Sequence, residues 1–213
     1  MSATPRRSPR ATSTAKKKSP RKSPAALEVL AEGKHLRLVK RAGWEYAERT
    51  KVSGVVVIVA RTDADELVLI EQLRPVIGER IIELPAGLAG DSASTSDEPL
   101  KNAVQRELFE ETGYEAKRIE LLTEGPSSAG LTNEILSFFL ATGLTRTGDG
   151  GGDEAEDIQV HVVPLAETGA WLAAQHKRGK MIDPKVWAGL YFAGARHTPK
   201  PRASRRGPAR PRR

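Results

Sequence analysis

The 213-residue sequence predicts an α/β fold, because runs typical of buried strands alternate with stretches of helical periodicity. Residues 54–60 (GVVVIVA) are apolar and rich in β-branched side chains, which is typical of a strand covered on both faces. A turn at 63–65 leads to residues 66–73 (ELVLIEQL), the expected hairpin partner. Further strands are predicted within 27–52, 119–122, 134–141 and 157–165.

Two closing helices are predicted at 166–179 and 183–194. We expect their large apolar side chains to belong to the core, namely Trp171, Leu172, Trp187, Leu190 and Phe192. The preceding residues 145–157 (TRTGDGGGDEAED) are rich in glycine and acids, so we expect a flexible loop that cannot pack a core.

The chain is organised around a helix predicted between Glu98 and Gly113. Pro99 suits the first helical position, and an acid such as Glu98 is favourable there. Gly113 suits the left-handed position that ends a helix. The apolar residues Ala103, Val104 and Leu108 recur at helical spacing, so one face of this helix is expected to face a core.

Three carboxylates lie close together on the same helix. Glu107 and Glu111 are four residues apart, which places them on one face, and Glu110 lies beside them. Like charges at this spacing destabilise a helix by a few tenths of a kcal/mol, roughly, so a cation is expected nearby. Clustered carboxylates suit Mg²⁺ or Mn²⁺. The alternative is a solvated acidic face on which Arg106 pairs with Glu110.

Charge divides the chain into an acidic body and two basic tails. Residues 1–24 and 196–213 each hold eight Lys and Arg and no acid, which leaves 18 of the 34 basic residues against all 27 acids in 25–195. Proline and charge predict disorder in both tails. They are either solubilising segments or salt-dependent binding sites for nucleic acid. We expect a small N-terminal β subdomain at 25–53 and the main domain at 54–195.

Composition excludes several classes of protein. No apolar run approaches 18 residues and the start lacks an apolar segment, so neither a membrane protein nor a secreted one is expected. The absence of cysteine excludes disulfides and thiol catalysis, and is consistent with a cytoplasmic protein. The glycines at 148–152 are not followed by Lys-Ser or Lys-Thr, so they do not form a P-loop.

The helix resembles a known motif. Glu98, seven further residues, and then Arg106-Glu107-Leu108-Phe109-Glu110-Glu111-Thr112-Gly113-Tyr114 resemble the second half of the Nudix box. In that motif the opening glycine lies six residues before the first glutamate, whereas Gly87 lies eleven before Glu98. A five-residue insertion in the Ser- and Asp-rich loop accounts for the difference, since such a loop lengthens at little entropic cost. The insertion leaves the role of Glu98 open.

Several other stretches resemble the ADP-ribose pyrophosphatase branch of the Nudix hydrolases over residues 30–193. They are Trp44-Glu45, Glu71-Gln72-Leu73-Arg74-Pro75, Glu83-Leu84-Pro85-Ala86-Gly87, Gly130-Leu131-Thr132-Asn133-Glu134, Asp153-Glu154-Ala155-Glu156-Asp157-Ile158 and Gly179-Lys180-Met181-Ile182-Asp183. The resemblance implies an α/β/α sandwich with a mixed sheet and a small N-terminal β subdomain. It also implies a homodimer in which that subdomain helps to build the partner's site.

The resemblance further implies a role for individual residues. The metal ligands would be Glu107, Glu111, the backbone carbonyl of Ala86, and Glu156, with Glu110 close by. Glu154 would be the base that activates water. The candidate substrate-binding residues are Trp44 to stack on adenine, Glu83 to hydrogen-bond the base, Arg49 and Arg74 to hold the phosphates, and Gly130 and Glu134 in their matched stretch. Alternatively, Trp44 only packs an interface and Arg74 pairs with Glu71 or Glu83.

The resemblance implies a Mg²⁺-dependent hydrolase, with Mn²⁺ as the alternative metal, that cleaves ADP-ribose to AMP and ribose 5-phosphate. One departure concerns the substrate: Ala129 stands between Ser128 and Gly130, where such enzymes often carry proline. This favours, as an alternative, another nucleoside diphosphate derivative such as the nucleotide-sugar GDP-mannose. A third reading is a non-catalytic module that binds a nucleotide or nucleic acid, but the retained Glu107, Glu110 and Glu111 oppose it.

Overall fold

The computed structural model describes residues 26–90, 98–152 and 157–195. Its organising strand is β4 (Gly54–Arg61), whose side chains alternate between two separate hydrophobic clusters. Val57 and Val59 belong to one cluster, and Val56 and Ile58 belong to the other. This alternation follows from the two-residue period of a strand. Since all four side chains are fully buried, the prediction of a strand covered on both faces is confirmed.

The main sheet has eight strands and is mixed. Its path runs β11-β6-β5-β4-β9-β8, with β10 paired to β5 and β7 paired to β4. The β4–β9 and β11–β6 pairs are parallel, and the other pairs are antiparallel. Besides β4, the strands are β5 (Glu66–Arg74), β6 (Glu79–Glu83), β7 (Ala86–Ala89), β8 (Tyr114–Pro126), β9 (Ile135–Arg146), β10 (Ile158–Pro164) and β11 (Met181–Ile182).

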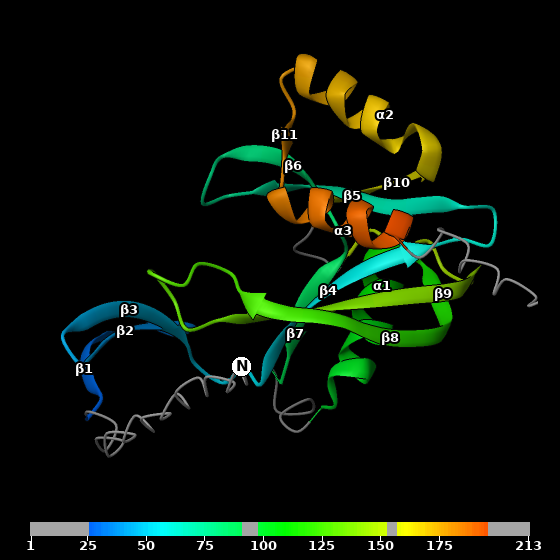
Figure 1. Ribbon diagram of the computed structural model, residues 1–213. Helices are drawn as coiled ribbons and strands as arrows, with labels where there is room; N and C mark the ends of the chain where they lie inside the picture. Colours follow the sequence, from blue (N-terminus) through cyan, green and yellow to red (C-terminus); the bar gives the residue numbers. More distant parts are fainter. Residues whose placement is uncertain (1–25, 91–97, 153–156, 196–213) are drawn as a thin grey trace, which may run out of the picture.

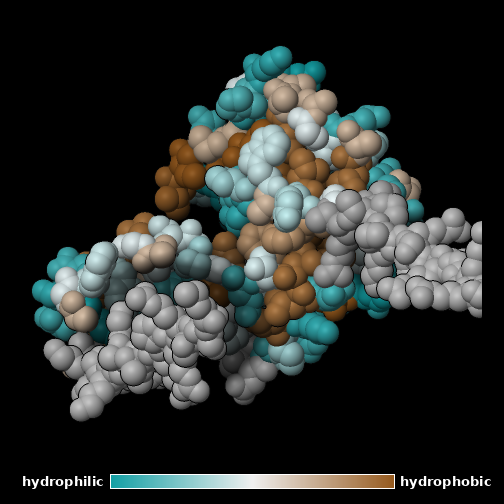
Figure 2. Space-filling model, in the orientation of Figure 1, coloured by the Kyte–Doolittle hydropathy of each residue, from teal (hydrophilic) through white to brown (hydrophobic). Residues whose placement is uncertain are grey.

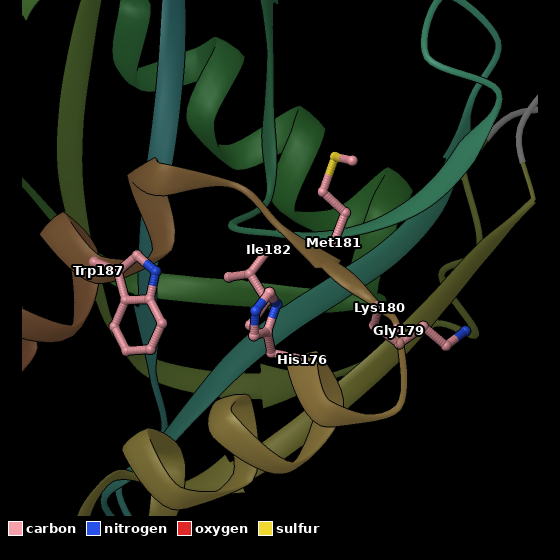
Figure 3. A pocket seen from close by; sticks show the side chains of 6 residues that line it. All are labelled: His176, Gly179, Lys180, Met181, Ile182 and Trp187. Carbon is pink, nitrogen blue, oxygen red and sulfur yellow. The ribbon is translucent and has the colours of Figure 1, made fainter.

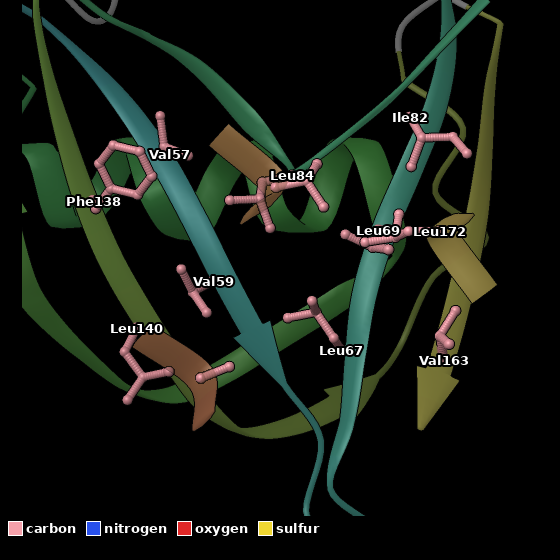
Figure 4. Close-up of a cluster of buried hydrophobic side chains, with 12 residues drawn as sticks. Val57, Val59, Leu67, Leu69, Ile82, Leu84, Phe138, Leu140, Val163 and Leu172 are labelled. Carbon is pink, nitrogen blue, oxygen red and sulfur yellow. The ribbon is translucent and has the colours of Figure 1, made fainter. Parts of the chain in front are cut away.

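Helices cover both faces of this sheet (Figure 1). Helix α1 (Leu100–Thr112) packs Ala103, Val104 and Leu108 against one face. Helices α2 (Leu165–Lys177) and α3 (Pro184–Ala195) cover the other face, with Leu172 of α2 among the buried side chains of that cluster (Figure 4). The structure therefore confirms the expected mixed α/β fold, in which helices lie on both sides of a mixed sheet.

A separate three-stranded antiparallel sheet precedes the main sheet. It consists of β1 (Glu28–Glu32), β2 (Leu36–Arg41) and β3 (Trp44–Arg49) in the order β1-β2-β3. The sheet contacts the rest of the chain through Ala47, whose N–H donates to the carbonyl of Leu131 at 2.8 Å. This contact places β3 beside the loop that connects β8 to β9.

Helix α1 ends where the sequence predicted and begins one residue later, because Pro99 precedes the first helical residue, Leu100. Pro99 occupies the N-cap, and Gly113 adopts φ 73° while its N–H donates to the carbonyl of Phe109 at 2.8 Å. The loop that follows β9 lies against the end of this helix at residues 147–152. Gly151 and Gly152 donate to the carbonyls of Glu111 and Glu110, each at 3.0 Å. None of these loop residues belongs to the two hydrophobic clusters, so the loop is attached to the helix end without packing the core.

Close contact explains why glycine recurs in that loop. A Cβ at Gly150 would lie 2.5 Å from the carbonyl carbon of Thr112, and one at Gly148 would lie 2.9 Å from the Phe109 ring. The glycines thus allow the loop backbone to lie directly against the helix end, where it satisfies carbonyls that the helix leaves without partners.

Other details also differ from the sequence prediction. The short strands β7 and β11 were not predicted, and β8 and β9 are longer than expected. Trp187 is 47% exposed and is not a core residue, whereas Leu172 is fully buried.

No helix in the described ranges is long and apolar enough to cross a membrane. The predicted disordered tails, with their alternative nucleic-acid contact, lie outside the described residues.

One buried carboxylate connects four strands of the main sheet. Glu71 on β5 is 4% exposed and accepts hydrogen bonds from Lys180 Nζ at 2.5 Å and Arg80 Nε at 3.1 Å. His161 Nε2 lies 3.2 Å from its other oxygen. Burial opposes ionisation of Glu71, but these partners outweigh it and lower the pKa of the carboxyl group. The network ties β6, β10 and the start of β11 to β5.

We predict that Gly113→Ala destabilises the protein by about 2–4 kcal/mol, since alanine is strained at this φ and its Cβ would lie 2.1 Å from the carbonyl oxygen of Gly148. Gly169→Ala is the matched control, because Gly169 lies in α2 with open space around it, so alanine should stabilise the helix by about 0.5–1 kcal/mol. Denaturant unfolding measures both effects. Equal stability of the two variants would contradict the proposed role of Gly113.

Candidate active site

A cleft of about 410 Å³ brings together residues from distant parts of the chain. Its wall includes backbone and carboxylates around α1 and β7, together with cations contributed by several other segments. The lining residues are Arg49, Val55, Val57, Arg74, Ala86, Gly87, Leu88, Arg106, Glu107, Glu110, Glu134, Leu136 and Lys185. Six of the sequence-predicted site residues line this cleft: Arg49, Arg74, Ala86, Glu107, Glu110 and Glu134.

The carboxylates of α1 are packed against the start of β7. Glu111 is 3% exposed, and its Oε2 accepts a hydrogen bond from the N–H of Ala86 at 3.0 Å. Glu107 lies so close to Gly87 that an added Cβ there would fall 1.9 Å from its carboxyl carbon. Glu110 is more open, with 48% of its side chain exposed. Glycine at position 87 is therefore required for the present position of the Glu107 carboxylate.

Arg106 links the acids around the helix. Its guanidinium contacts Glu98 at 3.0 Å, Glu107 at 2.9 Å and Glu110 at 3.1 Å. It also donates to the carbonyl of Leu88 at 2.9 Å. The hydrogen bond with Glu98 is the main reason why the pKa of Arg106 is raised. Arg106 thus pairs with Glu110, as one sequence interpretation held, but it pairs with the other two acids as well.

These contacts show the position of Glu98, which follows the predicted five-residue insertion. Its side chain is 11% exposed and still reaches Arg106 on the second turn of the helix. Glu98 does not line the cleft. In the described structure this acid holds Arg106 in place, while the carboxylates nearest to β7 are Glu107 and Glu111.

The donor atoms beside β7 have the chemistry that a hard divalent cation requires. Two carboxylates approach one backbone turn, and the space that a Cβ would fill at Gly87 is occupied by Glu107 oxygens. Among the residues that the structure describes, no three carboxylate or imidazole side chains converge closely enough to complete a metal shell. The predicted base Glu154 and the predicted ligand Glu156 lie outside those residues.

The residues that flank 153–156 are nevertheless fixed near α1. On one side, Gly152 donates to the carbonyl of Glu110, and Gly151 accepts a hydrogen bond from the N–H of Ile158 at 3.3 Å. On the other side, Asp157 pairs with Arg80 at 2.6 Å. The described residues before the gap, Gly151 and Gly152, therefore lie beside the C-terminal turn of the helix that carries Glu110 and Glu111.

The predicted phosphate-binding arginines are each held by a carboxylate. Arg49 pairs with Glu134 at 2.6 Å. Arg74 pairs with Glu83 at 2.6 Å, and Glu83 is 5% exposed and also accepts from Gln72 at 3.1 Å. Arg74 thus forms the ion pair with Glu83 that the sequence left as an alternative, and it still lines the cleft.

Trp44 and Gly130 lie apart from the other candidates. Both line a separate pocket of about 190 Å³ between β3 and the loop before β9, and neither lines the cleft. Trp44 is 69% exposed at the start of β3. Within one chain, therefore, the structure does not bring the indole to the carboxylates of α1.

A second cavity of about 410 Å³ lies between α2, β11 and α3 (Figure 3). It is lined by His176, Gly179, Lys180, Met181, Ile182 and Trp187, and it shares no lining residue with the cleft. Its one ammonium group is already bound to Glu71. None of its lining residues is among the sequence-predicted site residues.

Sequence reasoning missed Lys185, which enters the cleft from the first turn of α3. The available signal was the position of Lys185, which lies two residues after Asp183, the end of the matched stretch, and at the start of a predicted helix. A cation at the start of a helix is locally unfavourable, which is the kind of local conflict that marks functional positions.

We predict that Gly87→Ala weakens Mn²⁺ binding by about tenfold or more, because the new Cβ displaces the Glu107 carboxylate. The displaced group is the end of a flexible side chain, so the free energy of unfolding should change by less than about 1 kcal/mol. Calorimetric titration with Mn²⁺ and denaturant unfolding measure the two quantities. Unchanged affinity in the variant would show that the position of Glu107 does not matter for metal binding.

Comparison with known proteins gives a family match over more than half of the chain. The family description "NUDIX domain" matches residues 50–184. The chain is 34% identical over 134 residues to a methanol dehydrogenase activator of Bacillus methanolicus, covering 62% of this chain and 68% of that protein. It is 35% identical over 121 residues to an ADP-ribose pyrophosphatase of Bacillus subtilis, covering 56% of this chain and 63% of that protein.

A GDP-mannose pyrophosphatase of Citrobacter koseri is 32% identical over 142 residues, covering 63% of this chain and 69% of that protein. The crystal structure of an ADP compounds hydrolase superposes with a TM-score of 0.61 at 20% identity, covering 82% of this chain and 92% of that one, which supports the fold alone. The matches to the two Bacillus proteins and to the GDP-mannose pyrophosphatase span 63–69% of the lengths of those proteins. Because the family match extends over more than half of its residues, the chain belongs to the Nudix hydrolase family.

Proposed function

We propose that this chain hydrolyses the diphosphate bond of ADP-ribose to AMP and ribose 5-phosphate with the help of a divalent metal ion. The observation that carries the proposal is the packing of Glu107 and Glu111 beside Ala86 and Gly87, in a cleft that arginines also line. Oxygen donors and cations in one cleft suit a substrate whose reacting group is an anionic diphosphate.

The proposed ligands of Mg²⁺, or of Mn²⁺ in its place, are Glu107, Glu111, the carbonyl of Ala86, and Glu156. When bound, such an ion polarises a phosphate and lowers the pKa of a coordinated water. Glu110 remains partly exposed on the same helix and is proposed to assist at the cleft. The burial of Glu111 and its hydrogen bond to β7 fix one of these groups before any ion arrives.

We propose Glu154 as the base that takes the proton from the attacking water. The support comes from its described neighbours, because Gly151 and Gly152 anchor the preceding backbone to the carbonyls of Glu111 and Glu110. A base carried on a short segment next to the helix can reach the cleft when substrate is present.

The substrate-binding roles are proposed for residues on both sides of the carboxylates. Arg49 and Arg74 would contact phosphate oxygens, with each guanidinium oriented by its acid, Glu134 or Glu83. Because Glu83 is buried and already bound to Arg74 and Gln72, its contacts favour holding Arg74 over touching the base directly.

We propose a homodimer in which Trp44, and the pocket it shares with Gly130, serve the partner's site. Trp44 is 69% exposed and outside the cleft of its own chain. Other exposed hydrophobic residues lie on the small sheet and on the β5–β6 hairpin, and the hairpin forms a hydrophobic (brown) patch in Figure 2. They are Val29, Leu30, Leu36 and Leu38 on the sheet, and Leu73, Val76 and Ile77 on the hairpin. Exposed apolar surface of this extent is typical of interfaces.

A second candidate substrate is GDP-mannose, because relatives named for GDP-mannose and for ADP-ribose hydrolysis resemble the chain almost equally, at 32% and 35% identity. Both compounds present the same diphosphate to the carboxylates and arginines. The base and the sugar differ, so turnover of the two compounds side by side separates the candidates.

We predict that purified protein forms AMP and ribose 5-phosphate from ADP-ribose only when Mg²⁺ or Mn²⁺ is present. Glu111→Gln should lower kcat/KM by about 100-fold or more, because the amide keeps the acceptor for the Ala86 N–H but loses the charge that binds metal. Glu115→Gln, at an exposed position, is the matched control. Product chromatography measures both, and full activity of Glu111→Gln would remove the proposed metal site.

We predict that the protein sediments as a dimer and that Val76→Asp shifts it towards the monomer, because a charge would be buried at the hairpin tip. If Trp44 serves the partner's site, the monomeric variant should also bind ADP-ribose less tightly. Sedimentation velocity and calorimetry test the two parts. A wild-type monomer with full affinity for ADP-ribose would contradict the dimer.

A further inference from the structure

We infer that Lys185 is a diphosphate-binding residue of the cleft and acts there together with Arg74. The inference rests on the proposed function for its substrate class, but Lys185 itself is a residue to which that function gives no role. Lys185 lines the same cleft as Arg74, Gly87 and Glu107, although it comes from the opposite end of the domain sequence.

Strand pairing explains how Lys185 reaches the cleft. The short strand β11 runs parallel to β6, with Met181 opposite Ile81 and Ile182 opposite Ile82. The N–H of Asp183 continues this ladder by donating to the carbonyl of Ile82 at 2.9 Å. Asp183 is thereby attached to the strand that carries Glu83, and α3 begins at the next residue.

Asp183 then orients the lysine. One of its oxygens accepts the backbone N–H of Lys185 at 2.7 Å, and the other pairs with Lys185 Nζ. The Asp183 side chain is 14% exposed, whereas that of Lys185 is 31% exposed. An ammonium group has three donors, so an ion pair with one carboxylate oxygen leaves others for a ligand.

The neighbouring ion pair has the same construction. Glu83 is almost buried and holds Arg74, whose side chain is 42% exposed at the cleft. Glu83 on β6 and Asp183 after β11 follow residues that pair with each other in the parallel ladder. Glu83 holds Arg74 at the cleft, and Asp183 holds Lys185 there. Such an arrangement fixes the cations in advance, which reduces the conformational entropy that is lost when an anion binds.

The position of Lys185 in its helix argues against a merely local role. It lies in the first turn of α3, where the helix dipole disfavours a positive charge. The ion pair with Asp183 offsets this unfavourable interaction, but a lysine contributes nothing to the stability of a helix start. The charge does have a use in the cleft, because Glu107, Glu110 and Glu134 also line it and repel a diphosphate.

The test compares Lys185→Met with Lys177→Met, a change at an exposed lysine of α2 that does not line the cleft. Calorimetry gives the Kd of ADP-ribose in EDTA, so that hydrolysis does not interfere. Loss of one charge-assisted contact should weaken binding by about 5- to 20-fold in Lys185→Met and leave Lys177→Met unchanged. Lys185→Arg should recover most of the affinity, since it restores the charge.

Two further ligands separate a phosphate contact from a structural effect. Inorganic pyrophosphate, which has only the phosphates, should lose affinity in Lys185→Met, whereas adenosine, which has none, should not. An unchanged Kd for ADP-ribose, or an equal loss for adenosine, would overturn the inference. Unfolding of Lys185→Met is monitored by its melting temperature, and Lys185→Gln, which retains a polar side chain, replaces it if the methionine variant does not fold.

The outcomes distinguish this inference from the proposed function. If the wild type binds ADP-ribose but does not hydrolyse it with Mg²⁺, the proposed function fails while the binding series still decides the role of Lys185. If it binds GDP-mannose instead, the same variants are compared with that diphosphate. If the wild type binds none of these diphosphates, the inference about Lys185 is wrong.

Discussion

The close approach of α1 to the start of β7 is the contact on which the rest of the site depends. Glu111 is buried against the N–H of Ala86, and Glu107 occupies the space that any side chain at position 87 would fill. Buried carboxylates require partners, and here a backbone N–H and the guanidinium of Arg106 supply them. The other face of α1 packs against Val56 and Ile58 of β4, so the helix that carries these carboxylates also belongs to the core.

The helix and its ends were predictable from sequence because they depend on local chemistry. Pro99 and Gly113 bound α1 as expected, and the spacing of Ala103, Val104 and Leu108 correctly gave its buried face. The clustering of Glu107 and Glu111 followed from the same helical period. Local rules also predicted β4, which is a nearly continuous apolar run, and β5, which follows it after the turn at 63–65.

What sequence could not supply depends on contacts between distant segments. Strand β11 has two residues and pairs with the parallel edge of β6, so its pairing has no local signal. A lysine at a helix start is visible in the sequence, but the cleft that it lines is not. The glycine-rich loop was expected not to pack a core, but the sequence did not show that Gly150 lies directly against the backbone of Thr112. Trp187 is apolar and helical, yet its exposure depends on where α2 and α3 meet β11.

Two arginines of the cleft follow one pattern, in which a poorly exposed acid holds a more exposed cation. Glu83 holds Arg74, Glu134 holds Arg49, and their side chains are 7% and 18% exposed against 42% and 40% for the arginines. Each acid thereby limits the positions that its guanidinium can take, and a group fixed in this way loses less conformational entropy when it binds a ligand. Arg106 departs from the pattern, because it pairs with Glu107 and with the more exposed Glu110. The cleft therefore contains two arginines held by acids outside α1 and one arginine held by the acids of α1 itself.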